Sequence, residues 1–278
     1  MKLARVIADQ GHMAVVVAEG ERLLDVSPLL RKLGLDGRAI PLDRETRREL
    51  RRRLPMEEEI ATVQAETFLP PISSRQILAI GLNYRSHAEE MNSPLPEEPI
   101  VFAKSPSSVV GHRDTVCLPG NVGRVDYEAE VAVVIGRRAS HLKAEEAGEV
   151  ISGYSLLNDV TMRDVQGRAS AAGRPWFLAK SPDTFCPFGP FMVGAEDVSE
   201  PENLDFTLTL NGEVRQNGSM SDLIFSVPEL LEYITRFITL EPGDIIATGT
   251  PSGVGPIKPG DFMAIESPVL GTLENPVS

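Results

Sequence analysis

The chain has few cysteines and few aromatic residues for its length. Only two of its 278 residues are cysteines, Cys117 and Cys186, and aromatic residues make up 5% of the total, with a single tryptophan. Two cysteines far apart in sequence provide neither a disulfide framework nor a metal-binding spacing. The low count is typical of a reducing compartment, so we expect a cytoplasmic protein whose thiols are structural.

The chain also lacks an excess of basic residues and any long apolar run. Its 27 Lys and Arg against 40 Asp and Glu give a formal net charge of −13, which argues against nucleic acid or an anionic membrane as partner. No run reaches the about 18 apolar residues of a membrane span, and the charged stretch MKLARVIADQGHMAVVVAEG does not resemble a secretory signal. We expect no nucleic-acid and no membrane partner. A small anionic substrate would need local cations.

What the chain does contain is many short strand patterns and few helical ones. Residues 1–27 show three strand patterns separated by turn residues, residues 28–55 are polar and helical in pattern, and residues 55–74 read as a connector. We therefore predict a small amino-terminal α+β accessory domain and linker over 1–72 and a larger domain over 73–278. Strands outnumber helices without regular βαβ alternation, which predicts a mainly β, α+β protein.

Two glutamates stand at the head of the most apolar strand pattern, VDYEAEVAVVIG (125–136). Glu128 and Glu130 are two positions apart, so both side chains point to one face of the strand, roughly 6–7 Å apart. Two buried carboxylates on one face need a cation, whereas carboxylates at a solvated strand end do not. The segment alone leaves both interpretations open.

Residues 76–278 contain six motifs that, in this order, resemble those of the fumarylacetoacetate hydrolase family. The motifs are GLNYRSHAEE, FAKSPSSVVG, DYEAEVAVVIG, GYSLLNDVTMRD, FLAKSP and GTPSGVG. The resemblance implies a mixed β-sandwich or roll with few helices, a divalent metal and usually a homodimer. The amino-terminal unit is similar to the accessory region of the bacterial decarboxylase and isomerase branch of the family.

The resemblance implies that Glu128, Glu130 and Asp159 form a three-carboxylate metal site. Three hard oxygen donors without histidine or thiolate suit Mg²⁺ or Mn²⁺. We interpret Asp126, just ahead of them, as lying outside this ligand set or facing solvent. A metal held in this way can bind a 2-oxo acid through its carboxylate and keto oxygens and stabilise negative charge that develops on the keto oxygen.

The resemblance also implies roles for five further residues around a bound acid. Lys180 and Arg163 look like the family's cations that face the substrate carboxylate and the enolate, and the apolar neighbours of Lys180 count against a surface lysine. Gln166 and Thr250 match positions that hydrogen-bond the acid, and Lys104 is a more ambiguous substrate-binding candidate. The GTPSGVG segment lacks the spacing and lysine of a phosphate loop, so we expect its glycines to let the backbone approach the site closely.

His87 is the candidate catalytic base. Glu90 follows it three positions later, so on a helical turn the carboxylate can orient the imidazole and raise its basicity. From the residues alone, an exposed surface pair is the alternative; by resemblance, the pair is similar to the dyad that activates water in the family's hydrolases. Residues 85–99 are polar and rich in proline, and we expect them to form a lid that is mobile or held away from the metal until substrate binds. The remaining histidines are expected at the surface: His12, His112 and His141.

These observations lead first to a Mg²⁺- or Mn²⁺-dependent hydrolase that cleaves a C–C bond in an acylpyruvate-like 2,4-dioxo acid, with His87 and Glu90 activating water. Two alternative enzymes use the same site: an oxaloacetate decarboxylase, and an isomerase or decarboxylase of 2-hydroxyhepta-2,4-diene-1,7-dioate from aromatic catabolism. A metal-stabilised small-acid binding protein is the alternative outside the enzymes. Turnover of any 2-oxo acid would exclude this last possibility.

Overall fold

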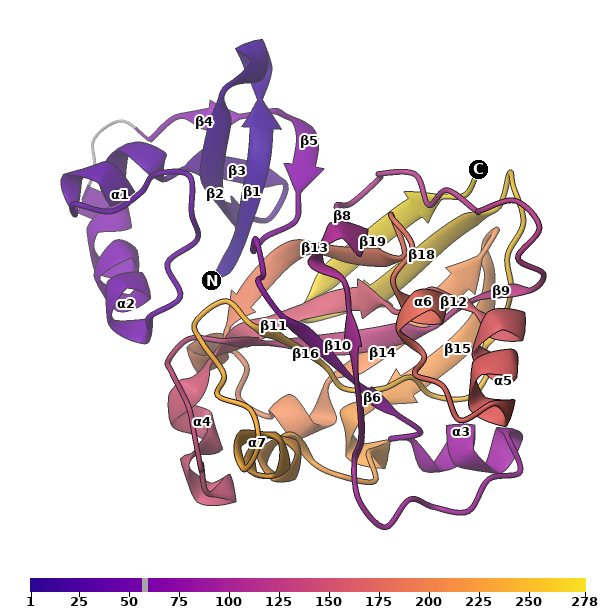
Figure 1. Cartoon of the computed structure of the whole chain (residues 1–278). Helices are drawn as coiled ribbons and strands as arrows, with labels where there is room; N and C mark the ends of the chain where they lie inside the picture. The colour runs from indigo at the N-terminus through magenta and orange to yellow at the C-terminus, as the bar shows by residue number, and fades with distance from the viewer. Residues whose placement is uncertain (57–59) are drawn as a thin grey trace.

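The computed structural model describes residues 1–56 and 60–278, and one large sheet runs through most of the molecule (Figure 1). The strands of this sheet are β1 (Lys2–Ala8), β2 (Met13–Glu19), β3 (Arg22–Asp25), β4 (Thr62–Val63), β5 (Ala65–Leu69), β6 (Ile77–Gly81), β7 (Ile100–Lys104), β8 (Val109–Val110), β10 (Ala129–Ile135), β11 (Ile151–Asn158), β13 (Cys186–Gly194) and β16 (Ile245–Ala247). They follow the order β4-β3-β2-β1-β13-β11-β10-β16-β6-β7, with β5 on β1 and β8 on β13. The predicted mainly β architecture is confirmed.

Two smaller sheets accompany the large one. One contains β12 (Thr161–Met162), β9 (Val125–Tyr127) and β17 (Gly255–Pro256), and the other β15 (Glu213–Ser219), β14 (Asp205–Leu210), β18 (Phe262–Ser267) and β19 (Gly271–Pro276). The turn between β14 and β15 is Asn211-Gly212, and both residues have positive φ angles, 56° and 82°. This is the backbone that a tight two-residue hairpin requires, and Asn-Gly is a pair that adopts it readily.

In the described residues, seven α-helices lie around the sheets, and their ends follow from local sequence. They are α1 (Ser27–Lys32), α2 (Arg44–Arg53), α3 (Arg85–Glu90), α4 (Ala147–Val150), α5 (Arg163–Ala171), α6 (Phe177–Lys180) and α7 (Val227–Thr235). The Asp43 side chain accepts a hydrogen bond from the Thr46 backbone N–H at 2.7 Å and caps α2. Ser226 and Glu229 form a capping box at the start of α7. Over residues 1–56 and 60–278, no helix combines the length and hydropathy that crossing a bilayer requires.

The amino-terminal unit is joined to the larger part by a continuous sheet. Strand β1 pairs antiparallel with β13, with Lys2 opposite Val193 and Leu3 opposite Met192. A core of buried side chains also spans the junction, with Leu3 on one side and Phe188 and Val134 on the other. The boundary at residue 72 stays a prediction, and the two parts share both a sheet and a core.

The connector expected over 55–74 differs from the structure. Its residues 57–59 lie outside the described residues, and residues 60–74 contain β4 and β5. These strands are held by long-range pairing, since Leu23 pairs with Val63 and Arg5 with Leu69. Their sequence has no strong strand pattern of its own, so the neighbouring strands β3 and β1 decide their conformation.

Candidate active site and metal centre

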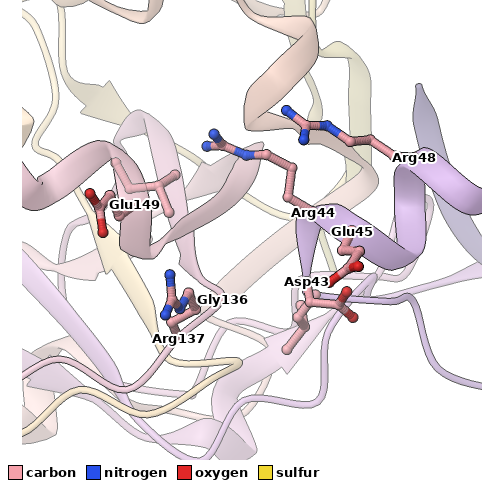
Figure 2. A pocket seen from close by; sticks show the side chains of 9 residues that line it. Asp43, Arg44, Glu45, Arg48, Gly136, Arg137 and Glu149 are labelled. Atoms are coloured by element: carbon pink, nitrogen blue, oxygen red, sulfur yellow. The ribbon is translucent and has the colours of Figure 1, made fainter.

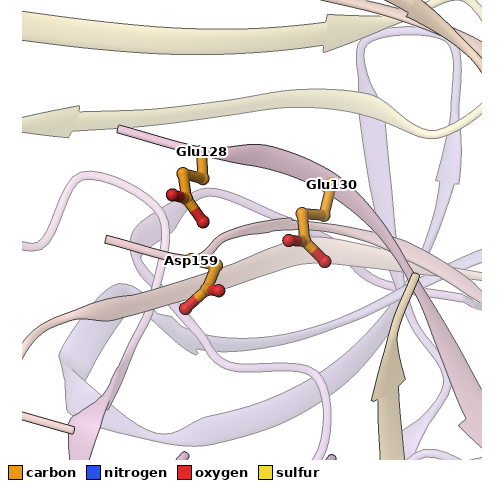
Figure 3. A group of neighbouring side chains, drawn as sticks. All are labelled: Glu128, Glu130 and Asp159. Carbon is orange, nitrogen blue, oxygen red and sulfur yellow. The ribbon is translucent and has the colours of Figure 1, made fainter. Parts of the chain in front are cut away.

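The acidic residues meet because β10 and β11 are antiparallel neighbours. In their register Ala129 pairs with Asn158, so the start of β10 lies beside the end of β11. Glu128 precedes β10 and Asp159 follows β11, and the Asp159 backbone N–H donates to the Glu128 carbonyl at 2.8 Å. One carboxylate oxygen from each of Glu128, Glu130 and Asp159 lies within 4.8 Å of the others (Figure 3). The three side chains predicted as ligands therefore converge.

Glu130 is the member of this trio that lacks a charged partner. Its exposure is 1%, and its Oε2 accepts a hydrogen bond from the Gly249 backbone N–H at 2.8 Å. Within the described part of the chain no cation lies within ion-pair distance of it. Burial and the neighbouring Asp159 raise the pKa of Glu130 well above its ordinary value. A buried carboxylate in this position needs a cation close by, and the all-carboxylate donor set fits a divalent metal ion such as Mg²⁺ or Mn²⁺.

Lys180 neutralises the other side of the trio. Its Nζ lies 2.7 Å from Glu128 Oε2 and 2.5 Å from Asp159 Oδ2, and its side chain is buried. Burial opposes the charge on Lys180, but Asp159 and Glu128 outweigh burial and raise its pKa. Burial likewise acts against the charge on Glu128, but Lys180 and Arg163 hold the pKa of that carboxyl at about 2. Glu128 and Lys180 are thus charged at neutral pH.

Lys104 lies behind Asp159. Its Nζ donates to Asp159 Oδ1 at 2.6 Å and to the backbone carbonyls of Val160 and Lys180. Its side chain is fully buried and does not line the cavity in front of the trio. This placement differs from the substrate contact expected from the sequence, because three protein oxygens already occupy the ammonium group.

Arg163, the first residue of α5, links its helix to β9 and to the acidic trio. Its Nε donates to Asp126 Oδ2 at 2.8 Å, its Nη1 donates to Gln166 Oε1 at 2.7 Å, and its Nη2 pairs with Glu128. Asp126 is outside the trio, as interpreted, but it is fully buried rather than solvated. Its other oxygen pairs with Arg124 Nε at 2.6 Å. Asp126 therefore fixes the guanidinium that faces Glu128.

The candidate base is held as a dyad on α3. His87 Nδ1 lies 3.2 Å from Glu90 Oε2, and the second oxygen of Glu90 accepts from the Gly253 backbone N–H at 3.0 Å. His87 is 6% exposed and Ala88 fully buried. The buried face of α3 and the Glu90 contact place this helix against the site rather than away from it. That the segment 85–99 is mobile without ligand stays a prediction.

Two glycines of the GTPSGVG region provide the backbone donors to these carboxylates. Gly249 has a φ of 106°, and a Cβ there would lie 2.9 Å from the Asn83 Cβ. Gly253 has a φ of 93°, and its Cβ would lie 2.1 Å from the Arg215 carbonyl oxygen. Only glycine fits these backbones and leaves the N–H groups free to reach Glu130 and Glu90. The expected close backbone approach is confirmed.

A cavity of about 400 Å³ opens onto the trio. The predicted residues among those that line it are His87, Glu128, Glu130, Asp159, Arg163, Gln166, Lys180 and Thr250. Thr250 Oγ1 accepts from Gln216 Nε2 at 2.8 Å, which fixes the hydroxyl oxygen at the cavity wall. The sequence reasoning missed Phe102 and Trp176, which also line the cavity. The sequence signal that could have pointed to Trp176 is that it is the single tryptophan of the chain and stands four positions before Lys180.

A second cavity of about 530 Å³ lies between α2 and the ends of β10 and β11 (Figure 2). Three arginines and three acidic residues line it: Arg44, Arg48, Arg137, Asp43, Glu45 and Glu149. These charges balance, so this cavity lacks the concentrated negative charge of the first one.

His112, expected at the surface, is partly buried elsewhere in the molecule, where its Nδ1 accepts from the Glu274 backbone N–H at 3.1 Å.

Residues 76–278 match the family model described as "Fumarylacetoacetate (FAA) hydrolase C-terminal". The chain belongs to the fumarylacetoacetate hydrolase family. It is 46% identical over 217 residues to the oxaloacetate tautomerase YisK of Bacillus subtilis, covering 74% of this chain and 71% of that protein. Family membership supports an enzyme and a divalent metal at the acidic trio.

Solved structures extend the likeness to the amino-terminal unit. A 5-carboxymethyl-2-hydroxymuconate delta-isomerase from Mycobacterium smegmatis is 34% identical with a TM-score of 0.78, covering 100% of this chain and 98% of that one. A maleylpyruvate hydrolase from Sphingobium is 32% identical with a TM-score of 0.82, covering 100% and 99%. The three relatives are named for three different reactions, so the family alone does not choose among them.

Proposed function

We propose that this protein is a divalent-metal-dependent enzyme that enolises a short 2-oxo acid, interconverting the keto and enol forms of an oxaloacetate-like dicarboxylate. The observation that carries the proposal is the cavity shared by the acidic trio, Lys180 and His87. The similarity to an oxaloacetate tautomerase and to an isomerase supports this reading over the hydrolysis that the sequence placed first.

Glu128, Glu130 and Asp159 would hold the metal, which would supply positive charge for the carboxylate and keto oxygens of the acid. Lys180 and Arg163 are fixed cations on the same side of the cavity and contribute to binding an anion. Gln166 and Thr250 line the cavity with oxygen and nitrogen atoms for hydrogen bonds. These groups orient the acid without moving a proton.

His87 is the group that moves the proton. Glu90 binds its Nδ1, so Nε2 is the ring nitrogen left to exchange a proton with the carbon next to the keto group. Enolisation needs one base of this kind near the keto carbon and a fixed positive charge near the keto oxygen. Burial within the cavity limits competing solvent around the imidazole.

Hydrolysis of an acylpyruvate-like 2,4-dioxo acid is the second candidate, and the His87–Glu90 pair favours it because the same base could activate water. Decarboxylation of oxaloacetate and isomerisation of a dienedioate would use the same charged groups. A small-acid binding protein would need the trio and the cations but no base. The buried, oriented imidazole speaks against binding alone.

A panel of substrates tests the proposal. Oxaloacetate, an acylpyruvate and a 2-hydroxydienedioate are each incubated with the protein and Mg²⁺, while enol absorbance, released CO₂ and cleavage products are followed separately. We expect the enol–keto conversion of oxaloacetate to exceed the rate with Mg²⁺ alone, with less CO₂ and cleavage product. If the acylpyruvate is cleaved faster than oxaloacetate is tautomerised, the assignment moves to the hydrolase. If none of the three acids is turned over, the small-acid binding protein is the remaining candidate.

A further inference from the structure

Apart from the acidic trio and the charged groups that contact it, the cavity is lined mainly by neutral side chains, some of them aromatic. Every Asp, Glu, Lys and Arg that lines it belongs to the trio or contacts a member of it. Away from that group the lining is neutral and includes Met91, Phe102 and Trp176. A ligand with an anionic head would therefore place the rest of its chain against aromatic side chains.

Trp176 is fixed in place from three sides. Its ring centroid lies 5.5 Å from that of Phe102 in an edge-on arrangement, and its Nε1 donates to Ser170 Oγ at 2.8 Å. On the third side is Gly81, where an added Cβ would lie only 3.1 Å from the indole Cζ3. The indole is thus held before any ligand arrives, which lowers the cost of packing a ligand against it.

Trp176 and Phe102 both lie close to Lys180. Trp176 directly precedes α6, and its carbonyl oxygen accepts from the backbone N–H groups of Ala179 and Lys180 at 2.8 and 3.1 Å. Lys180 Nζ lies 4.9 Å from the Phe102 ring centroid. One helical turn therefore separates the indole wall from the cation that pairs with Glu128.

We infer that Trp176 and Phe102 form the wall that selects the tail of the 2-oxo acid, and that any tail long enough to reach this wall is uncharged. The inference rests on the proposed function. A carboxylate pressed against the two rings would lose hydration without gaining an unpaired cation, because the Lys180 ammonium near the Phe102 ring is already paired with Glu128 and Asp159. The second carboxylate of a four-carbon acid avoids this, because it is two bonds from the keto carbon and stays beside the acidic trio and its cations.

A matched pair of ligands tests the wall. 2-Oxohexanoate and 2-oxoadipate have the same head and the same chain length, but only the second ends in a carboxylate. Their affinities are measured in the presence of Mg²⁺ by calorimetry and by tryptophan fluorescence, since Trp176 is the only tryptophan. We expect 2-oxohexanoate to bind at least roughly tenfold more tightly, as apolar pocket contacts allow, and to change the emission of Trp176.

Variants of Trp176 test whether this side chain causes the preference for 2-oxohexanoate over 2-oxoadipate. Trp176→Ala is expected to reduce the affinity ratio of 2-oxohexanoate to 2-oxoadipate by roughly tenfold, and Trp176→Phe, which keeps an aromatic ring, by less. Leu178→Ala is the matched control, because Leu178 is on α6, is 75% exposed and does not line the cavity. We expect that control to keep the wild-type ratio.

The outcomes separate this inference from the proposed function. If pyruvate binds with Mg²⁺ but the matched pair binds equally well to the wild-type protein, only the inference about the wall is overturned. An unchanged ratio in folded Trp176→Ala would overturn it as well, and so would an unchanged Trp176 emission in the wild-type protein when 2-oxohexanoate binds. If no 2-oxo acid binds with Mg²⁺ at all, the proposed function is overturned and the inference with it.

Discussion

Lys104 and Asp159 form a fully buried ion pair, with Nζ 2.6 Å from Oδ1 and side-chain exposures of 0% and 1%. The remaining contacts of Lys104 are backbone carbonyls, so its charge serves to place Asp159 and the end of α6. Asp159 keeps Lys180 as a second partner, so loss of Lys104 removes one of the two cations that compensate this carboxylate. Lys104→Met is therefore expected to lower the free energy of unfolding by about 1.5–3 kcal/mol in urea titrations, as for loss of a buried hydrogen bond to a charged group.

The double variant Lys104→Met/Asp159→Asn checks the cause of that loss. It removes both charges, so part of the lost stability should return. Lys258→Met, at an exposed lysine, is the control and should stay within about 0.5 kcal/mol of the wild type. An equal loss in the single and double variants would mean that packing, and not the ion pair, explains the effect.

His87→Ala tests the proton-transfer role. The variant removes the imidazole but leaves the trio and both cations in place, so calorimetry should still detect Mg²⁺ and oxalate. The rate of enol–keto conversion, or of hydrolysis if that is the reaction, should fall by at least roughly a hundredfold. His141→Ala is the control. A His87→Ala rate close to that of the wild type would move the base elsewhere in the cavity.

His112 should make stability depend on pH. Burial lowers the pKa of its imidazole, and its neutral Nδ1 accepts a backbone hydrogen bond. Below the ordinary pKa of about 6.5 the unfolded chain binds a proton before the folded chain does, so the free energy of unfolding falls as the pH drops. Urea titrations at pH 7.5 and 5.0 should show a smaller fall for His112→Asn than for the wild type. His12→Asn should behave like the wild type; equal falls in all three proteins would contradict the account.

The two cysteines should differ sharply in reactivity. Cys117 is exposed, whereas Cys186 is buried and its pKa is raised to about 12. The thiolate is the reactive form, so a disulfide reagent at pH 8 should label one thiol per folded chain quickly. Cys117→Ser should abolish this fast phase, and unfolding should expose the second thiol. Fast labelling that persists in Cys117→Ser would show that the core around Cys186 opens easily.

The acidic trio was predicted from the sequence through the resemblance of its motifs to a known family, because the strand pattern alone left Glu128 and Glu130 open between a metal site and a solvated strand end. Glu128 and Glu130 stand beside an apolar run, and Asp159 ends the next strand pattern along the chain. Antiparallel pairing of β10 with β11 then brings them together. His87 and Glu90 were likewise assigned through the resemblance, because their spacing places them in contact on a helical turn but is equally typical of an exposed surface pair.

Other features depend on contacts that no local pattern encodes. Lys104 was an ambiguous substrate-binding candidate, and only the fold shows that Asp159, which is far away in sequence, already occupies its ammonium group. Strands β4 and β5 were read as a connector because their conformation comes from pairing with β3 and β1. Trp176 was missed because its role depends on contacts with Phe102 on β7 and Gly81 on β6, both far from it in sequence.

The central claim is that the carboxylate trio binds a divalent cation, and Glu130 offers the most direct test of it. Glu130→Gln keeps the shape of the side chain and an acceptor for the Gly249 N–H, and it removes one negative charge from the trio without breaking an ion pair. The measurement is a calorimetric titration of wild-type protein and Glu130→Gln with Mg²⁺. The account predicts a single binding event in the wild type that is lost in a folded Glu130→Gln. Unchanged Mg²⁺ binding by that variant would contradict it.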